Sequence, residues 1–495
     1  MQSRFTRRAV VCVFLSSAAT AAVAGASDTS LRPRSRAITP ARTRPQARTN
    51  LQDLIALSGL TGTVSVLLTD AATGEVIEGN TPDMPLPPAS VIKAVTALYA
   101  LETLGTDHRF ETRIFADGPI RDGVLDGDLI LVGGGNPNLV TDDLADLAQT
   151  LKDTGLTSVT GRFYVHDNVL PNLDEIDDSQ LDHLGYNPAI SGLNLNFNRV
   201  HFEWKRAGGA YTVAMDARSK QHRPSVTIAK MRIVDRDVPV YTYRDGGDLD
   251  EWTVARGALG RGGSRWLPVR YPALYAGEVF ATFARSQGIV LSPPSEIPAV
   301  RGTPIATHQS DDLQTMMRAM MQFSTNLTAE AAGLAATEER AGQARGLRTS
   351  ALGMTRWTKE RAGIAAQFAD HSGLGDTTRI TATGMVALLN AAGVASVMRP
   401  VLKIIPFLDD NKRPIADFPA QVLAKTGTLN FVSSLAGYIR TTSGRDLTFA
   451  IFAGDLDARA AGKLSNDEQP FGSITYNTNA KKLQAKLLRR WARLP

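Results

Sequence analysis

Apolar residues recur with two different periods near the start of the patterned part of the chain. Residues 62–68 alternate as in a strand, and 75–78 form a shorter run of the same kind. The turn-forming residues 70–74 between them predict a β-hairpin. In the run 89–104, apolar residues recur every three or four positions, which predicts a helix with one buried face. That face consists of Ile92, Val95, Leu98, Tyr99 and Leu101.

The pattern between residues 106 and 306 consists of short strand-like runs separated by many Gly, Asn, Asp and Pro residues. It predicts strands at 129–132, 161–166, 200–204 and 225–228. Helical patterning returns after residue 311, so we interpret the middle of the chain as material inserted between two halves of one domain.

The last third of the chain predicts helices followed by antiparallel strands. The predicted elements are helices at 313–335 and 379–392, strands at 421–424, 434–440 and 446–453, and a helix at 480–494. The final helix has a narrow apolar stripe at Leu483, Leu487, Trp491 and Leu494, with lysines and arginines elsewhere. Such a helix either lies on a membrane or packs on a sheet with a solvated basic face, and the regular stripe favours packing.

The N-terminus has the pattern of an export signal. Arg4, Arg7 and Arg8 precede an apolar segment at 9–15 and small residues with A-x-A sites, which predicts a cleaved signal over 1–26 for Sec or twin-arginine export to the periplasm. The only cysteine, Cys12, lies inside this segment, so the mature chain would have none.

Length and charge narrow the class of protein. A chain of 495 residues is expected to form two or three domains. The formal net charge is +5, but the first 50 residues contain nine arginines and one acid, which leaves −3 for residues 51–495. The folded part therefore gives no indication of nucleic-acid binding. Residues 27–50 are rich in Arg and Pro and predict a linker, or a peripheral contact with an anionic membrane.

A serine and a lysine three residues apart, Ser90 and Lys93, open the predicted helix at 89–104. On a helix this spacing places both side chains on one face, so the lysine can take the proton of the serine hydroxyl if its pKa is lowered. Alone, Ser90 would be read as a helix N-cap. However, no other serine in the chain has a lysine three positions later.

Two later motifs supply the groups that such a nucleophile needs. Ser324 and Asn326 form the only Ser-x-Asn, where Ser324 would relay a proton to a leaving amine and Asn326 would bond Lys93 and a substrate amide. Lys425 lies on a predicted strand. Its charge would lower the pKa of Lys93 and attract a substrate carboxylate. Taken singly, the first pair reads as a helix cap and the lysine as an edge-strand residue.

The lysine motif continues with Thr426, Gly427 and Thr428. The two threonine hydroxyls would bond the substrate carboxylate, and the glycine would let backbone approach backbone. The three motifs in this order are those of serine β-lactamases and penicillin-binding proteins. Their separations resemble the class C low-molecular-mass penicillin-binding proteins, the serine D-alanyl-D-alanine carboxypeptidases and endopeptidases. Further resembling stretches are 127–137, 161–167, 186–198, 370–374 and 425–438.

This resemblance implies an α+β transpeptidase domain, an antiparallel sheet flanked by helices, with β-rich inserted domains. The catalytic domain would comprise 51–105 plus 307–495, a second domain 106–204 plus 262–306, and a third 205–261. The implied substrate is a peptidoglycan peptide, the implied inhibitors are β-lactams, and no cofactor is implied. The backbone N–H groups of Ser90 and Thr428 would form the oxyanion hole.

The sequence departs from the family pattern at several positions. Asn136 replaces a usual Asp, which affects recognition of a cationic substrate side chain if that acid mediates it, and His371 and Gly375 replace the usual Gly and Ser. The segment 405–412 lacks the expected Gly-Thr-Leu and Arg. We therefore expect substrate fit to differ from that of the family, while the catalytic set is complete.

Other chemistries find little support. Gly133-Gly134-Gly135 is not followed by Gly-Lys-Ser/Thr, the histidines form no H-E-x-x-H, and no G-x-S-x-G is present, so no phosphate loop, metal or Ser-His-Asp triad is expected. A β-lactamase or esterase, and a catalytically idle wall-binding scaffold, remain alternatives. The sequence leaves open the oligomeric state and the preference between carboxypeptidase and endopeptidase substrates.

Overall fold

The computed structural model describes residues 50–342, 345–409, 411–465 and 467–495. The chain divides into two units, 1–48 and 49–495, and all described residues belong to the second. The predicted export signal at 1–26 lies outside the described residues, as does the predicted linker apart from Asn50.

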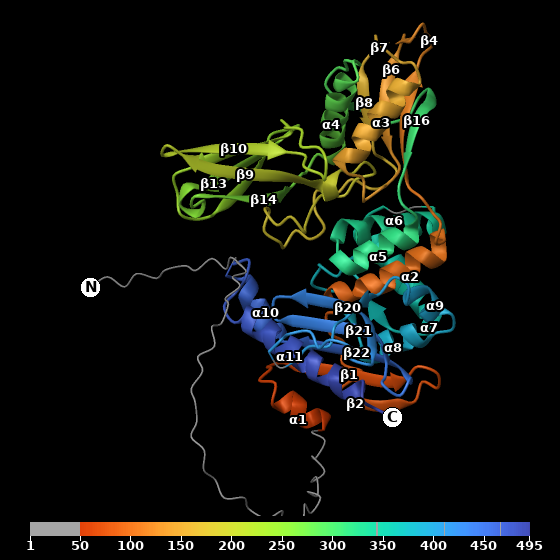
Figure 1. The fold of residues 1–495 in the computed structure, drawn as a ribbon, viewed down its shortest axis with the longest axis vertical. Coiled ribbons are helices and arrows are strands. Elements are labelled where there is room, and N and C mark those ends of the chain that lie inside the picture. The colour runs from red at the N-terminus through yellow and green to blue at the C-terminus, as the bar shows by residue number, and fades with distance from the viewer. Residues whose placement is uncertain (1–49, 343–344, 410, 466) are drawn as a thin grey trace, which may run out of the picture. The chain divides into compact units, whose positions relative to one another are not determined.

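A six-stranded antiparallel sheet joins the two ends of the described chain, in the order β19-β20-β21-β22-β1-β2 (Figure 1). Its strands are β1 (Thr63–Asp70), β2 (Val76–Asn80), β19 (Lys403–Ile404), β20 (Gln421–Leu429), β21 (Val432–Arg440) and β22 (Asp446–Gly454). The predicted hairpin and the three predicted C-terminal strands are confirmed. β1 pairs with β22 along its whole length, which brings segments from both ends of the sequence into one domain.

Helices cover both faces of this sheet. They are α1 (Leu51–Ala56), α2 (Lys93–Leu104), α5 (Leu313–Phe323), α6 (Asn326–Ala341), α7 (Leu347–Ala362), α8 (Ala382–Asn390), α9 (Val394–Met398), α10 (Leu456–Lys463) and α11 (Ser473–Trp491). Helices α2 and α5 to α9 share one core with β1, β21 and β22, and α11 shares a second core with the other face.

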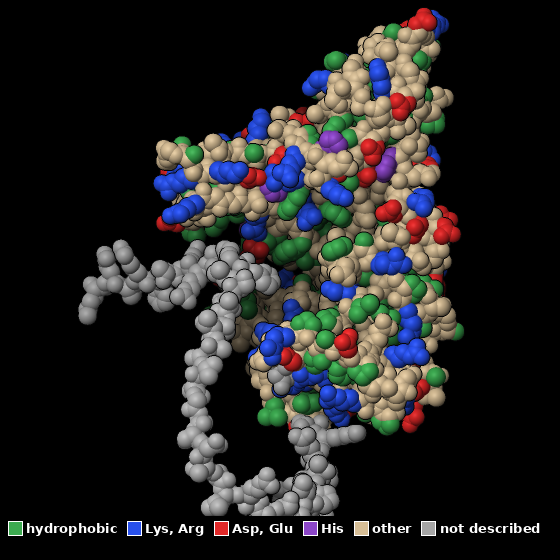
Figure 2. Space-filling view, in the orientation of Figure 1, with side chains coloured by type: hydrophobic (Ala, Val, Ile, Leu, Met, Phe, Trp, Pro, Cys, Tyr) green, Lys and Arg blue, Asp and Glu red, His purple; other side chains and the backbone are tan. Residues whose placement is uncertain are grey.

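The final helix packs on the sheet as the apolar stripe indicates. Leu483, Leu487 and Trp491 are buried in the core that α11 forms with the sheet, while Lys481 and Lys482 are exposed. Lys and Arg side chains gather on the surface over α10 and α11 in Figure 2. The helix begins seven residues before the predicted start at residue 480, at Ser473. No helix in the described part of the chain is long and apolar enough to cross a membrane.

Three predicted helices differ from the observed ones, and the first two differences affect the site. The first begins as a 3-10 helix, η1 (Ala89–Ile92), and continues as α2. The helix predicted over 313–335 is wrong as a single element, because it divides into α5 and α6. Ser324 ends α5 in the left-handed region with φ 60°, and Thr325 is extended. The helix predicted at 379–392 is shorter, since α8 covers only Ala382–Asn390.

The inserted section contains a five-stranded sheet in the order β15-β8-β6-β3-β16. Its strands are β3 (Glu111–Asp117), β6 (Asp128–Gly133), β8 (Phe163–His166), β15 (Ser295–Glu296) and β16 (Thr303–Gln309). Two helices that the sequence pattern did not predict, α3 (Thr141–Asp153) and α4 (Pro272–Ser286), pack against one another and against this sheet.

The insertion also contains three three-stranded sheets, β10-β9-β14, β11-β13-β12 and the short β4-β5-β7. The strands of the first two are β9 (Arg199–Ala207), β10 (Ala210–Asp216), β11 (Ala229–Val234), β12 (Tyr241–Asp245), β13 (Asp250–Ala255) and β14 (Gly262–Pro268). The smaller elements are β4 (Ile120–Arg121), β5 (Val124–Leu125), β7 (Ser158–Val159), β17 (Ala366–Gln367), β18 (Arg379–Ile380), η2 (Asn196–Asn198) and η3 (Arg256–Ala258).

The strand predicted at 225–228 is wrong. Ser225 makes a single bridge to Asp216, and the strand begins at Ala229. Val226 and Ile228 are nevertheless buried, so the apolar pattern there marks core contacts without a hydrogen-bonded ladder. The partition into three domains stays a prediction. Strands β9 and β16 run across its proposed boundaries at 204/205 and 306/307.

Candidate active site

Ser90 lies in η1, where the 3-10 geometry aligns it with Lys93. A 3-10 helix has three residues per turn, so side chains at i and i+3 lie one above the other. The Ser90 hydroxyl accepts a hydrogen bond from Lys93 Nζ at 3.0 Å. Neither η1 nor α2 has a side-chain N-cap bond, so Ser90 does not serve as a helix cap.

Lys93 is completely buried and its three ammonium protons have three acceptors. Besides Ser90, Nζ donates to Asn326 Oδ1 at 2.7 Å and to the Ser372 carbonyl at 2.7 Å. Burial lowers the pKa of Lys93 to about 8, and the carboxylates of Glu330 and Asp370 oppose that shift. A lysine with this pKa is neutral in an appreciable fraction of molecules near neutral pH, as a general base requires.

Lys425 reaches the same site from β20. Its Nζ donates to Ser324 Oγ at 2.9 Å and to the Thr426 carbonyl at 2.8 Å. Burial lowers the pKa of Lys425 to about 6, with further contributions from the charges of Lys93 and Lys403. The left-handed conformation of Ser324 turns its hydroxyl toward this lysine, so the break between α5 and α6 is part of the site.

Gly427 allows β20 to approach the serine turn. A Cβ at this position would lie 2.5 Å from the Pro88 carbonyl oxygen and 3.0 Å from Ser90 N. Among the described residues, β20 pairs with β19 only through Leu423 and Ala424, so its edge from Lys425 onward is open on that side. An open strand edge can accept an extended peptide by main-chain hydrogen bonding.

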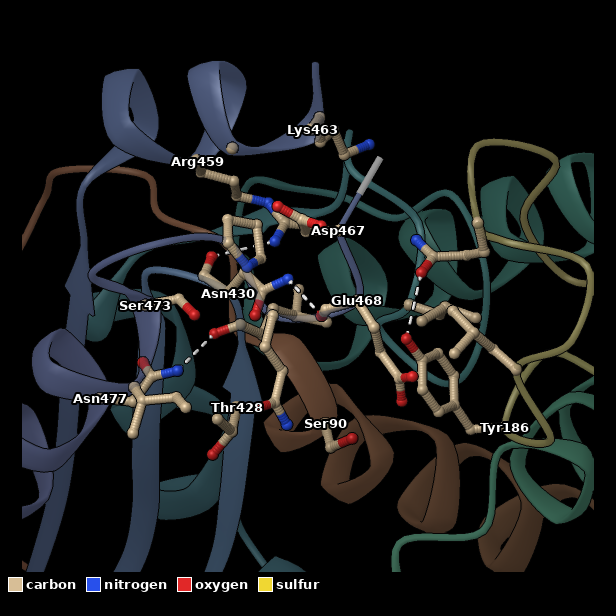
Figure 3. Close-up of a pocket in the computed structure, with 18 of the residues that line it drawn as sticks. Ser90, Tyr186, Thr428, Asn430, Arg459, Lys463, Asp467, Glu468, Ser473 and Asn477 are labelled. Carbon is tan, nitrogen blue, oxygen red and sulfur yellow. Dashed lines mark hydrogen bonds between the residues drawn. The ribbon is translucent and has the colours of Figure 1, made fainter. Parts of the chain in front are cut away.

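A cavity of about 670 Å³ opens at these residues. Five of the predicted site residues line it: Ser90, Ser324, Asn326, Thr426 and Thr428. The other three lie at its base, where Lys93 and Lys425 are bonded to the lining residues and Gly427 packs on Ser90. The structure therefore brings all eight predicted site residues together. Figure 3 shows Ser90 and Thr428 facing this space.

Two buried carboxylates next to Lys93 were not assigned a role from the sequence. Glu330 accepts hydrogen bonds from His371 N and Ser372 N, both at 2.9 Å, and Asp370 accepts from Gly373 N at 2.6 Å and Gly375 N at 2.5 Å. Burial raises the pKa of Glu330 to about 8 and also raises that of Asp370. The sequence contains one signal that could have identified Glu330: it lies four residues after Asn326, which places both side chains on the same face of α6.

The outer wall of the cavity was also not predicted. Arg459 in α10 donates to the Asn430 carbonyl at 3.1 Å and to Asp376 Oδ1 at 2.5 Å. Lys463 pairs with the same aspartate and donates to Ser179 Oγ at 3.0 Å. The cavity is lined by Arg459, Asn430, Lys463 and Ser179, but not by Asp376. Figure 3 shows Arg459 and Lys463 above Thr428.

The inserted section contributes to this wall through residues 179–186. Asn326 Nδ2 donates to the Tyr186 carbonyl at 2.8 Å, so the insertion contacts a predicted site residue directly. On the other side of the wall, in the segment between α10 and α11, Glu468 pairs with Arg265 at 3.1 Å and with His183 at 3.7 Å. The hydrogen bond from His183 and the charge of Arg265 lower the pKa of Glu468 to about 2.

Two of the residues that depart from the family pattern, Asn136 and His371, are buried and make hydrogen-bond contacts with protein groups. Asn136 is buried, its Oδ1 accepts from Asn138 N at 3.0 Å, and it is not among the residues that line the cavity. His371 is also buried, with Nε2 2.8 Å from Ser350 Oγ. Burial lowers the pKa of His371 to about 3, so the ring is neutral near physiological pH.

Comparisons with known proteins agree with this geometry. The model of the D-Ala-D-Ala carboxypeptidase 3 (S13) family matches residues 47–469. A D-alanyl-D-alanine carboxypeptidase from Actinomadura sp. (strain R39) is 28% identical over 445 residues, which cover 82% of this chain and 80% of the relative. The carboxypeptidase DacB from Haemophilus influenzae is 23% identical over 75% of this chain and 82% of its own.

A solved structure of similar fold is penicillin binding protein 4 (dacB) from Haemophilus influenzae, with a TM-score of 0.70 at 20% identity over 90% of this chain and 100% of that chain. The same protein complexed with a β-lactam has a TM-score of 0.68 at 19% identity, with the same coverage. These likenesses confirm the α+β fold with β-rich insertions, and the family match confirms the resemblance drawn from the three motifs. The chain belongs to the D-Ala-D-Ala carboxypeptidase 3 (S13) family and is a serine-type D-Ala-D-Ala peptidase.

Proposed function

We propose that Ser90 is the nucleophile of this peptidase and that it forms an acyl-enzyme with the penultimate D-alanine of a peptidoglycan stem peptide. The contact that carries this proposal is the 3.0 Å hydrogen bond between Ser90 Oγ and Lys93 Nζ at the edge of the cavity. A buried lysine with a lowered pKa is a suitable general base for a serine hydroxyl.

Binding places the peptide along the open edge of β20. The terminal carboxylate lies at Lys425 and Thr426, and the peptide runs antiparallel to β20, past Thr428. The scissile carbonyl then lies next to Ser90, with the backbone N–H groups of Ser90 and Thr428 as the oxyanion hole. The closeness of β20 to the serine turn at Gly427 supports this arrangement.

Acylation begins when neutral Lys93 takes the proton of the Ser90 hydroxyl as Oγ attacks the carbonyl carbon. The tetrahedral intermediate collapses when the leaving amine receives a proton through Ser324, which is bonded to Lys425. Free D-alanine departs and leaves the ester on Ser90. Lys93 then passes the proton of Ser90 to Ser324, which restores the neutral base. In the second half of the reaction, Lys93 removes a proton from water, the attack of that water releases the shortened peptide, and the proton on Lys93 returns to Ser90 Oγ.

The same chemistry extends to two related compounds. A peptidoglycan cross-link is the same type of bond with a larger leaving amine, so the site would act as an endopeptidase where the second peptide fits. A β-lactam presents a strained amide to the same serine and would acylate it. Residues 1–26 would direct the enzyme to the periplasm, where its substrate lies.

Chromatography of muropeptides after incubation with purified protein tests this proposal. Wild-type protein should release D-alanine from pentapeptides, and any cross-link cleavage should appear in the same experiment. Ser90→Ala should abolish both. Ser179→Ala, on the cavity wall away from Lys93, serves as the matched control and should remain active. Full activity of Ser90→Ala would overturn the assignment of the nucleophile.

A further inference from the structure

The turn formed by residues 370–375 is held from both sides by buried carboxylates. Glu330 binds the backbone N–H groups of His371 and Ser372, and Asp370 binds those of Gly373 and Gly375. The carbonyl of Ser372 points the other way and accepts from Lys93. One residue of this turn is therefore bonded to Glu330 through its N–H and to Lys93 through its C=O.

Glu330 is completely buried on α6, where an ionised carboxylate requires compensation. Each of its oxygens accepts a backbone N–H at 2.9 Å, and such bonds favour the ionised form. Lys93 is the cation whose charge favours that ionised form. Glu330 and Lys93 are both fully buried. Glu330 can therefore affect a substrate in the cavity only through the groups that it contacts.

We infer that Glu330 is a positioning residue for the general base: its two oxygens hold the turn whose Ser372 carbonyl orients Lys93. The inference rests on the proposed role of Lys93. This role gives a reason for an acid at a position where its burial costs free energy, because the held turn keeps the Lys93 side chain directed at Ser90.

The charged groups that face Lys93 come from three elements. Glu330 approaches from α6, Asp370 from the 370–375 turn, and Lys425 from β20. His371 adjoins them but is neutral. Glu330→Gln replaces one of the two acceptor oxygens with an NH2 group, which cannot accept a hydrogen bond. One backbone N–H of the turn then has no partner on α6, and the Ser372 carbonyl is no longer held toward Lys93.

Steady-state kinetics of D-alanine release test the inference in the full-length protein. In Glu330→Gln, kcat should fall about tenfold or more while KM stays within about twofold of wild type, because Lys93 loses its orientation but the carboxylate site at Lys425 is unchanged. Glu339→Gln, an exposed position on the same helix, should leave both constants unchanged. Wild-type kcat in folded Glu330→Gln would overturn the inference.

A second variant covers the case in which Glu330→Gln does not fold. Glu330→Asp keeps both acceptor oxygens on a shorter side chain that does not reach the turn, so kcat should fall about tenfold or more at unchanged KM. Wild-type rates in this variant would contradict the positioning role. If the proposed function itself failed, neither wild type nor Glu339→Gln would release D-alanine.

Discussion

The proposed mechanism needs the two lysines of the site in opposite protonation states, and the Lys425→Arg variant separates their contributions to the pH profile. The proposed mechanism needs Lys93 neutral, with a pKa of about 8, and Lys425 protonated for the substrate carboxylate, with a pKa of about 6. At pH 7 each lysine is in its required form in about one molecule in ten, so about 1% of the free enzyme is active.

These pKa values predict the shape of the wild-type profile. The product of the two fractions is nearly constant between pH 6 and 8 and falls about tenfold at pH 5 and at pH 9. The fall in acid comes from protonation of Lys93, and the fall in base comes from loss of the proton on Lys425. The opposite assignment of the two pKa values would give a profile of the same shape.

Lys425→Arg distinguishes the two assignments because arginine stays charged at every accessible pH. The alkaline fall should disappear, and kcat/KM should rise about tenfold from pH 7 to pH 9 as Lys93 loses its proton. The assay is D-alanine release from a pentapeptide at subsaturating concentration. Lys481→Arg, also on the cavity wall, is the control and should keep the wild-type profile.

Two results would refute the reasoning. If Lys425→Arg still loses activity above pH 8, the alkaline limb does not come from Lys425. If its kcat/KM is flat between pH 7 and pH 9, Lys93 is the lysine of lower pKa. In either case the mechanism would need a different base or a different carboxylate partner.

Two predictions concern stability. His371 has a pKa of 6.5 in the unfolded chain, and burial lowers this pKa to about 3 in the folded state. The free energy of unfolding therefore falls as the pH drops from about 6.5 to about 3. Between pH 7 and 5, urea unfolding should show wild type losing about 2 kcal/mol more than His371→Gln, and equal losses would contradict the assignment. Trp491→Phe removes the 2.7 Å bond from Nε1 to Glu78 and leaves a small void, which should cost about 2 kcal/mol in urea unfolding. A cost below about 0.5 kcal/mol would mean that α11 is not held by this contact.

The sheet and the eight predicted site residues could be derived from the sequence because their signals are local. Strand periodicity marks β20 to β22, and the spacing of Ser90 and Lys93 already implies a shared face. Seven of the eight residues carry polar side chains whose chemistry is complementary, and Gly427 leaves room for the backbone, so finding all of them in one chain predicts that they meet.

The remainder depends on contacts that no local pattern encodes. Ser324 breaks a continuous helical pattern because its hydroxyl bonds Lys425, about a hundred residues later in the sequence. Glu330 looks like a surface acid on a helix, and only the packed turn at His371 and Ser372 makes it a buried one. Arg459 likewise acquires its position through Asp376, from a distant loop.

The central claim is that Ser90 carries the acyl group, and mass spectrometry of the penicillin-treated protein tests it most directly. After digestion, the peptide that contains Ser90 should carry the mass of one penicillin, and Ser90→Ala should carry none. Modification of any other residue in wild-type protein, or undiminished labelling of Ser90→Ala, would contradict the account.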